Sequence, residues 1–406
     1  MRVCVHDHCG HPYPVRLSRA LAARGHDVLH LTCPSVAAPR GPLAPRETDP
    51  ATLTLAQVPA PGALAKYRPV RRAVQEAVFA RRAGTRIAAF APDVVLSGNC
   101  SPLVQRLLQR RVHALGAAFV YWLQDLHAPA VRRAVPGRVA RAAAGPVARL
   151  EGSALRRGEA VVAIADAFRD AVIAHGVPEA RVHVVPNWAP VPELTPEPDA
   201  GQAWRMRHGH GRRFLYVYAG TLGLKHEPGH LLALARAHRD DPDTAILALV
   251  QGPGREVLLH HREREGLGNL TVLPPQPIDE LARVLAAADA GLATLTEAAG
   301  GFSVPSKILS YLAAGLPVLA AVPASNAAAE LLTATGAGTV VPPDDLGAWC
   351  AAAESLRTDP DSRARMSAAG RAHAERAFSM TAVGPRFERV FEAALTAPST
   401  ARSAAG

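Results

Sequence analysis

The sequence predicts an α/β fold with two doubly wound domains, and three observations lead to this prediction. The chain has 406 residues, more than one hydrophobic core usually organises, which favours two domains of about 200 residues each. Short apolar runs alternate with helical patterns along the chain, as in βαβ units with parallel strands. Residues 190–202 contain four prolines, which predict an extended linker between two halves of this pattern.

The first half predicts a domain spanning residues 1–195. It opens with a strand at residues 2–6, a helix whose apolar face carries Leu17 and Leu21, and a strand at residues 27–32. Further buried strands are predicted at residues 94–97, 119–123, 161–165 and 182–185.

The second half restarts the pattern and predicts a domain spanning residues 203–380. Its strands are predicted at residues 214–218, 245–250, 270–273, 290–295, 317–322 and 338–341. Three helical segments close the chain. Residues 396–406 are small and polar, so we expect this tail to be disordered.

Composition and charge narrow the classes of protein. No apolar stretch reaches the roughly 18–20 residues that span a bilayer, and the start lacks a signal peptide's apolar region, so we expect a cytoplasmic protein. The five cysteines have no paired spacing, which favours reduced thiols. Residues 1–195 carry a net charge of 25 − 13 = +12, whereas residues 196–406 carry 20 − 22 = −2. The basic half favours contact with anionic lipid, nucleic acid or an anionic acceptor without choosing among them.

Three glycine-rich turns follow predicted strands, where phosphates bind in doubly wound sheets. In the first, Gly220 and Thr221 precede Lys225, which could neutralise a diphosphate; an ordinary turn with a surface lysine explains the pattern equally well. In the second, Pro305 opens a helix whose first amides, those of Ser306 and Lys307, would face an anion. The third, residues 251–254 (Gln-Gly-Pro-Gly), is more simply a plain turn.

These motifs resemble the family 4 glycosyltransferases, most closely the colanic-acid and exopolysaccharide type. The resemblance rests on Ala-Gly-Thr-Leu-Gly-Leu-Lys at residues 219–225, Gly-Pro-Gly at 252–254, and Val-Pro-Ser-Lys at 304–307 with Leu-Ala-Ala-Gly-Leu-Pro-Val-Leu at 312–319. Weaker matches are Arg-Gly-His-Asp-Val at 24–28, Trp-Leu-Gln-Asp-Leu at 122–126 and Val-Val-Pro-Asn-Trp-Ala at 184–189.

The resemblance implies the GT-B fold, with two Rossmann-like domains facing across a cleft, the donor bound mainly by the second domain and the acceptor by the first. A final helix, residues 382–395, would pack back on the first domain. The implied reaction moves a sugar from a nucleotide diphosphate donor to an acceptor hydroxyl with retention of configuration, without a metal or other cofactor. Its context would be polysaccharide, glycolipid or glycosylated-metabolite biosynthesis.

The resemblance also implies roles for individual residues. The donor diphosphate would be bound by Gly10, Gly220, Thr221, Lys225, Ser306 and Lys307, with Thr221 standing where the family often has arginine. The family's two glutamates are replaced by Phe302 and Ser310, so the candidates for donor sugar and ribose binding are Phe302, Ser303 and Ser310. The family's catalytic histidine falls at Gln124, which leaves Asp125 and His127 as catalytic candidates; a helix cap is the plainer role of Asp125.

Arginines on predicted helices of the first domain favour either a membrane-surface patch or a solvated basic face. They are Arg71, Arg72, Arg81, Arg82, Arg106, Arg110, Arg111, Arg132, Arg133, Arg138 and Arg141. The first alternative would put the protein peripherally on the inner face of the membrane. The expected partners are therefore the nucleotide-sugar donor and a sugar, lipid-linked or small-molecule acceptor, with no nucleic acid.

Other activities fit the sequence less well. A metal-dependent GT-A transferase would use the Asp-Pro-Asp motifs at residues 241–243 or 359–361, which we interpret as turns, and His-Asp-His-Cys-Gly-His at 6–11 suits sugar hydroxyls better than a metal. A dinucleotide-dependent oxidoreductase is disfavoured because no Gly-x-Gly-x-x-Gly follows the first strand. An epimerase on the same scaffold and a basic nucleic-acid-binding protein remain alternatives. The donor, the acceptor, the linkage and the oligomeric state are not determined by the sequence.

Overall fold

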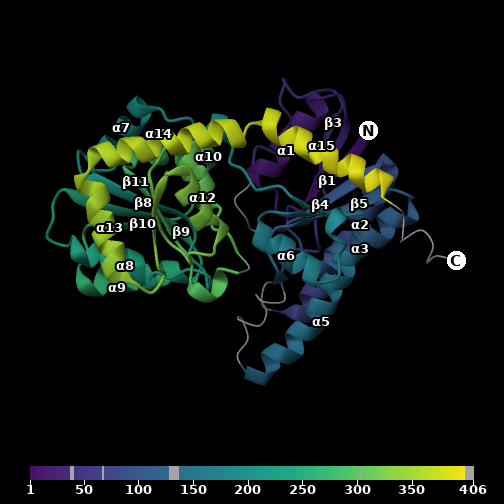
Figure 1. Cartoon of the computed structure of the whole chain (residues 1–406), viewed down its shortest axis with the longest axis horizontal. Coiled ribbons are helices and arrows are strands. Elements are labelled where there is room, and N and C mark those ends of the chain that lie inside the picture. The colour runs from purple at the N-terminus through teal and green to yellow at the C-terminus, as the bar shows by residue number, and fades with distance from the viewer. Residues whose placement is uncertain (37–40, 66–67, 128–136, 302, 398–406) are drawn as a thin grey trace. The chain divides into compact units, whose positions relative to one another are not determined.

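The computed structural model describes residues 1–36, 41–65, 68–127, 137–301 and 303–397. They form two compact units: unit 1 comprises Met1–Pro186 and Met380–Gly406, and unit 2 comprises Asn187–Ser379. Each unit contains a parallel β-sheet with helices on both faces (Figure 1). The predicted α/β class, with two Rossmann-like doubly wound domains, is confirmed.

Within the described residues, unit 1 has a seven-stranded sheet of order β3-β2-β1-β4-β5-β6-β7, and its strand pairs are parallel. The strands are β1 (Arg2–Asp7), β2 (Asp27–Thr32), β3 (Leu53–Gln57), β4 (Val94–Gly98), β5 (Ala118–Leu123), β6 (Ala160–Ala163) and β7 (Val182–Val184). Strands β4, β5 and β6 are buried along their length, because helices cover both faces of the sheet. The strand order reverses between β1 and β4, and ligands of such sheets bind beyond the carboxyl ends of strands at this point.

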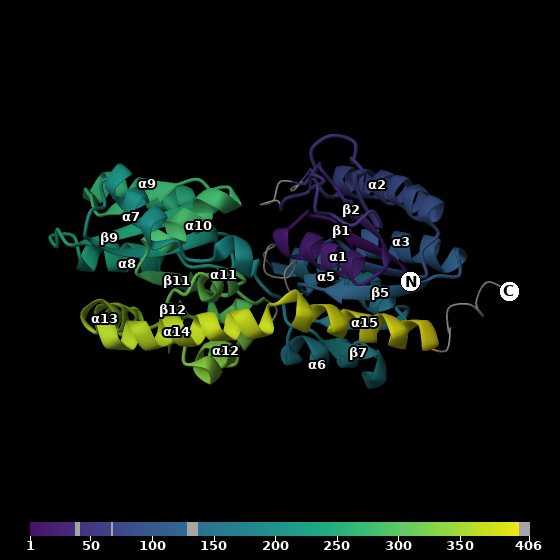
Figure 2. The same ribbon diagram turned by 90° about the horizontal axis from the view of Figure 1, so that it is seen from above.

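The helices of unit 1 form two layers (Figures 1 and 2). Those within the described residues are α1 (Pro12–Ala23), α2 (Pro69–Phe90), α3 (Pro102–Ala114), α5 (Gly137–Arg156), α6 (Asp166–Ala174) and α15 (Met380–Thr396). Helices α2, α3 and α5 pack together, whereas α1 packs against α15. In α15, Phe387 meets the ring of Trp122 edge-on at 5.3 Å between centroids, and Glu388 forms ion pairs with Arg24 at 2.6 Å and His26 at 2.9 Å.

Unit 2 has, within the described residues, a six-stranded parallel sheet of order β10-β9-β8-β11-β12-β13. The strands are β8 (Phe214–Thr221), β9 (Thr244–Gln251), β10 (Leu270–Leu273), β11 (Ala290–Thr294), β12 (Val318–Ala321) and β13 (Gly338–Val341). The helices are α7 (Pro198–Arg207), α8 (Gly229–Ala237), α9 (Pro253–Glu265), α10 (Ile278–Ala287), α11 (Lys307–Ala313), α12 (Ala327–Thr335), α13 (Leu346–Thr358) and α14 (Pro360–Ala377). Figure 1 shows α8 and α9 on one face of this sheet and α10 and α14 on the other.

Two features differ from the sequence prediction. The extended linker predicted at residues 190–202 is wrong, because this segment contains the 3-10 turn Val191–Leu194 and the start of α7. Pro198 is compatible with the first turn of α7, where an amide hydrogen has no intrahelical partner. Strand β3 was not predicted, and it pairs with β2 at the edge of its sheet. Most of the tail predicted to be disordered, residues 398–406, lies outside the described residues.

Candidate functional site

The carboxyl end of β8 brings Gly220 against the side chain of Lys307. Gly220 has a φ of +139°, and a Cβ atom there would stand 3.3 Å from Cε of Lys307. The Lys307 ammonium donates a hydrogen bond to the Tyr218 hydroxyl at 2.9 Å and lies 4.3 Å from the centre of that ring. Glycine at position 220 therefore leaves room for the lysine stem to reach the end of β8.

Tyr311 fixes α11 on the sheet beside this lysine. Its hydroxyl accepts the amide hydrogen of Ala219 at 2.8 Å and donates to the carbonyl of Leu292 at 3.1 Å. Gly291 gives the ring space, because a Cβ atom there would lie 2.5 Å from a ring carbon of Tyr311. Helix α11 is thus tied to both β8 and β11, the two central strands at this edge.

Lys225 contributes a second ammonium group at this edge. Its Nζ donates to the hydroxyl of Ser303 at 3.2 Å, and its carbonyl accepts the amide hydrogen of Thr296 at 2.9 Å. Buried Asn326 donates to the carbonyls of Gly300 and Ser303, both at 2.8 Å. The glycine-containing segment before α11 is therefore held from two sides.

Sequence reasoning missed Asn326. The available signal was an asparagine before a helical pattern, and its Oδ1 caps α12 by accepting the amide hydrogen of Ala328 at 3.0 Å. Its second role, on the segment before α11, depends on contacts 23 and 26 residues away in the chain.

The electrostatics of this edge favour an anion. Burial lowers the pKa of Lys307 to about 7. Burial, followed by the positive charges of Lys307 and Lys225, lowers the pKa of His226 to about 3, so this histidine is neutral near pH 7. Among the residues that the structure describes, Lys307 forms no ion pair with a carboxylate. An arriving anion would find two ammonium groups and a neutral imidazole.

Lysine is rare in this chain, which makes the pairing informative. Of 45 basic residues only Lys66, Lys225 and Lys307 are lysines, so 45 − 3 = 42 are arginines. Two of the three lysines therefore lie at one edge of one sheet. The rarity of lysine was readable from the sequence and would have strengthened both assignments.

The other predicted residues of unit 2 are less closely gathered. Thr221 accepts a hydrogen bond from the Gln251 side chain at 3.3 Å. Ser306 is exposed and precedes α11, whose first turn is closed by the amides of Ile308 and Leu309. Ser310 is partly buried inside α11. Phe302 lies outside the described residues.

The turn Gln-Gly-Pro-Gly at residues 251–254 packs against the β8 turn. Gly254 donates its amide hydrogen to the carbonyl of Leu222 at 2.9 Å, and a Cβ atom on Gly254 would lie 2.5 Å from Cγ of Leu222. Glycine at position 254 therefore allows close packing against Leu222. This contact agrees with the interpretation of residues 251–254 as a plain turn.

In unit 1, a buried carboxylate organises the loop that contains Gly10. Asp7 accepts the amide hydrogen of His11 at 2.6 Å and an Nδ2 hydrogen of Asn99 at 2.9 Å. Burial raises the pKa of Asp7, and these contacts oppose the rise. Gly10 has a φ of +75°, and its carbonyl accepts the amide hydrogen of Gly41 at 2.9 Å. This loop lies at the β1/β4 switch point of the sheet.

The two catalytic candidates follow β5 at the same edge. Asp125 is partly buried, and its charge contributes to raising the pKa of Tyr13, behind the larger effects of burial and Asp7. His127 is 35% exposed and contacts the fully buried Glu151 through Nδ1 at 3.0 Å. The Tyr13 hydroxyl donates to Oε1 of Gln124 at 3.1 Å, so the segment after β5 is connected to α1.

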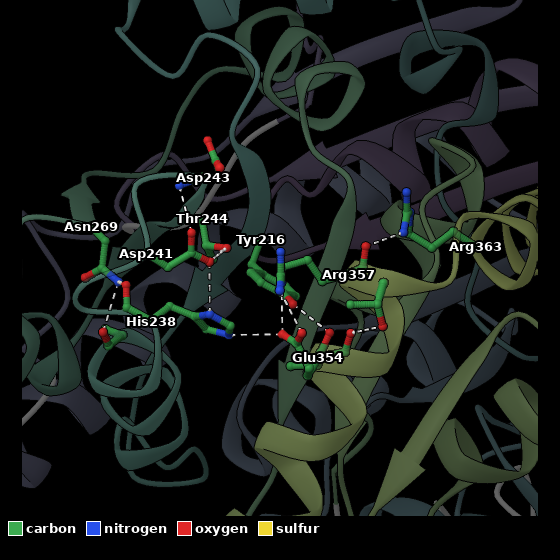
Figure 3. A network of polar contacts seen from close by, with 12 residues as sticks. Tyr216, His238, Asp241, Asp243, Thr244, Asn269, Glu354, Arg357 and Arg363 are labelled. Carbon is green, nitrogen blue, oxygen red and sulfur yellow. Dashed lines mark hydrogen bonds and ion pairs between the residues drawn. The ribbon is translucent and has the colours of Figure 1, made fainter.

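One Asp-Pro-Asp motif forms a turn and the other caps a helix; Figure 3 shows the first, at residues 241–243. Asp241 accepts the amide hydrogen of Asp243 at 2.9 Å and the hydroxyl hydrogen of Thr244 at 2.7 Å, just before β9 begins. Asp359 caps α14 by accepting the amide hydrogen of Ser362 at 2.8 Å. Across the described ranges, no group of three or more His, Cys, Asp and Glu side chains could hold a metal ion.

The two parallel sheets, each with helices on both faces, define the class: a protein with two Rossmann-like domains. Two family models match most of the chain: a glycosyl transferase 4-like domain over residues 10–188 and glycosyl transferases group 1 over residues 214–359. The chain belongs to the family 4-like glycosyltransferases with the GT-B fold.

Two curated relatives have related sequences. A GDP-mannose-dependent alpha-(1-6)-phosphatidylinositol monomannoside mannosyltransferase of Mycolicibacterium smegmatis is 31% identical over 199 residues, which is 48% of this chain and 52% of that protein. WcaI of Escherichia coli K12, named as a colanic acid biosynthesis glycosyl transferase, is 28% identical over 207 residues, 49% of this chain and 50% of WcaI. The matching region thus spans about half the length of these relatives.

A solved structure supports the fold. HepE of Anabaena, in complex with UDP-glucose, aligns with a TM-score of 0.71 at 15% identity, covering 97% of this chain and 99% of that one. Among the described residues, no helix has both the length and the apolar character needed to cross a membrane.

Proposed function

We propose that this protein is a glycosyltransferase that moves a sugar from a nucleotide diphosphate donor onto an acceptor hydroxyl with retention of configuration. The observation that carries the proposal is at the carboxyl edge of the unit 2 sheet. Lys307 lies against Gly220, Lys225 contacts Ser303, and the charges of both lysines act on His226. When the bond between sugar and diphosphate breaks, negative charge accumulates on the leaving phosphate. Ammonium groups fixed beforehand stabilise that charge without reorganising during the reaction.

The burial of Lys307 supports a ligand of opposite charge. Burial makes the Lys307 ammonium costly to keep protonated and lowers its pKa to about 7, and no carboxylate among the described residues pairs with it. A bound diphosphate supplies the missing charge and favours the protonated form. Lysine suits this role because its ammonium is a compact point charge on a flexible stem.

The names of the relatives suggest the context of the reaction. One acts on a phosphatidylinositol mannoside, and the other is named for colanic acid biosynthesis. We therefore propose polysaccharide or glycolipid biosynthesis, with a lipid-linked or sugar acceptor, in the cytoplasm. GDP-mannose and UDP-glucose, named for relatives, are the first donors to test.

The surface of α2 supports peripheral contact with an anionic membrane. Val70 and Val74 are 79% and 60% exposed, and Arg71, Arg81 and Arg82 are exposed on the same helix. The acidic residue of α2, Glu76, is buried and pairs with Arg72 at 2.8 Å. Exposed valines flanked by arginines suit a headgroup layer, where apolar side chains insert beside cations.

The remaining predicted arginines contribute unequally to this surface. On α3, Arg110 and Arg111 are exposed, and Arg106 is partly buried. Arg132 and Arg133 lie outside the described residues, and Arg138 and Arg141 belong to α5.

Co-sedimentation with phosphatidylglycerol vesicles tests whether the exposed surface of α2 binds an anionic membrane. Loss of binding in Val74→Asp supports it, and equal binding by both proteins contradicts it.

The test of the activity begins with donor binding. Thermal-shift assays against UDP, GDP, ADP and dTDP sugars should reveal one donor class, since a ligand at 100 times its Kd stabilises by about 2.7 kcal/mol. Lys225→Ala should abolish that shift and lower turnover, whereas Arg239→Ala, after the C-terminal end of α8, should change neither. Unchanged turnover in Lys225→Ala would refute the assignment. Product analysis separates transfer from epimerisation, because only transfer gives a glycosylated acceptor.

A further inference from the structure

A buried carboxylate contacts both the backbone amide and the ring of His127. Glu151, in α5, is fully buried, and its Oε1 accepts the backbone amide hydrogen of His127 at 2.9 Å. The same oxygen lies 3.0 Å from Nδ1 of the imidazole. An ionised carboxylate can only accept hydrogen bonds, so this contact places the hydrogen of the neutral ring on Nδ1. Nε2 then carries a lone pair, and the ring is 35% exposed.

The carboxylate sits on a well-anchored part of α5. One turn further along, the carbonyl of Ala154 accepts a hydrogen bond from buried Gln109 of α3 at 3.0 Å, and Ala154 and Leu155 are completely buried. Glu151 also acts on β5: burial raises the pKa of Tyr121, and the charge of Glu151 raises it further. Glu151 is therefore fixed between α5 and β5, behind the carboxyl end of that strand.

A second pair of the same kind lies at the opposite end of β5. Glu159, also buried, accepts the amide hydrogen of Phe119 at 2.8 Å and contacts Nε2 of His113 at 3.1 Å. Both pairs therefore join a buried glutamate, a backbone amide and an imidazole. Phe119 is near the start of β5, whereas His127 follows its end, so only the Glu151 pair lies at the edge where ligands of parallel sheets bind.

Burying a carboxylate is unfavourable unless its partners compensate, and a neutral amide would tie two segments together at a lower desolvation cost. A carboxylate that contacts an imidazole nitrogen can only accept a hydrogen bond from it, whereas a side-chain amide can also donate one. The carboxylate therefore selects one tautomer of the ring. The arrangement at His127 therefore suits a group that accepts hydrogen bonds from a ligand through Nε2.

We propose that Glu151 is a positioning residue for His127, holding the imidazole with Nδ1 protonated so that Nε2 accepts a hydrogen bond from a sugar hydroxyl. This deepens the proposed glycosyltransferase function and rests on it. Glu151 itself does not touch the ligand. Its effect on the reaction passes through the orientation and tautomer of His127.

The tautomer can be measured without activity. Long-range ¹H–¹⁵N spectra of protein labelled with ¹⁵N-histidine, with the His127 signals identified by their loss in His127→Gln, should show protonated Nδ1 and unprotonated Nε2 at pH 8. In Glu151→Leu the ring should change tautomer. A protonated Nε2 in the wild-type protein would overturn the proposal. Because this readout needs no substrate, it stands even if no sugar transfer is found.

Activity then compares the two glutamates. Glu151→Gln should lower kcat/KM by about 10- to 100-fold, the range found when the carboxylate that orients a metal-bound imidazole is lost. Glu159→Gln, the matched control, should leave kcat/KM unchanged even if it lowers Tm to a similar extent. Equal effects of both substitutions on kcat/KM would mean that the Glu151–His127 contact only stabilises the fold, and would overturn the proposal. If Glu151→Gln does not fold, Glu151→Asp should retain the tautomer and part of the activity, and loss of both would count against the proposal.

Discussion

Buried His30 should make unit 1 sensitive to acid, and His30→Gln should remove a defined part of that sensitivity. His30 lies in β2 with 1% of its surface exposed, and its Nδ1 is 2.8 Å from the Ser18 hydroxyl. Its Nε2 is buried with no hydrogen-bond partner among the described residues. Burial, with a smaller effect of Arg19, lowers its pKa to about 3. Protonation in the folded state would put an uncompensated charge between β2 and α1.

The magnitude follows from proton linkage. The folded-state pKa of His30 is depressed, so its contribution to stability is complete above the unfolded pKa of 6.5 and is lost as the pH falls towards about 3. At pH 5 the unfolded histidine is almost fully protonated and the folded one is not. The free energy of unfolding should therefore fall by about 2 kcal/mol between pH 7.5 and pH 5 because of this residue. This value depends little on the folded pKa, provided that it stays well below 5.

The assay is urea unfolding from pH 5 to 7.5, followed by hydrogen–deuterium exchange of peptides from β1 and β2, which reports on unit 1. His30→Gln should lose about 2 kcal/mol less than wild type over this pH range, whatever its stability at neutral pH. Ser18→Ala is the control, because it removes the hydrogen-bond partner but keeps the titrating ring. An unchanged pH dependence in His30→Gln would refute the reasoning. So would an equal flattening in Ser18→Ala.

Three further predictions concern other parts of the chain. The affinity for UDP or GDP, measured by calorimetry, should decrease as the pH rises above about 7, because only the protonated Lys307 attracts a diphosphate. In Lys307→Met this decrease should disappear; the same pH dependence in both proteins would contradict the assignment. Gly291→Ala should destabilise unit 2 by roughly 1–3 kcal/mol through overlap with Tyr311, whereas Gly268→Ala, with open space around it, should change stability by at most about 0.5 kcal/mol in urea unfolding. Glu388→Gln should cost unit 1 about 1 kcal/mol, because its ion pair with Arg24 is partly exposed. The Arg24 hydrogen bond lowers the pKa of Glu388 to about 2, so this difference should be present above pH 4.5 and vanish towards pH 2; a constant difference would exclude the pairing as its cause.

Secondary structure was predictable where the local pattern is strong. Strands such as Val94–Gly98 begin with adjacent apolar residues, a pattern typical of a parallel sheet that is covered on both faces. The linker prediction for residues 190–202 was wrong because proline is common both in extended linkers and in first helical turns. The local sequence does not distinguish these two structures. Strand β3 was missed because it lies at an edge, where partial exposure weakens the apolar pattern.

By itself, the sequence determined the two-sheet α/β architecture and the turns that end the strands, because apolar periodicity and glycine placement are local properties of the chain. Tertiary structure alone decided which side chains meet at those turns. Lys225 contacts Ser303 78 residues away, Lys307 contacts Tyr218 89 residues away, and Glu151 reaches His127 from a different element. Such contacts arise because parallel strands bring their carboxyl ends to one edge. The distance between two residues along the chain does not predict that they will be close in space.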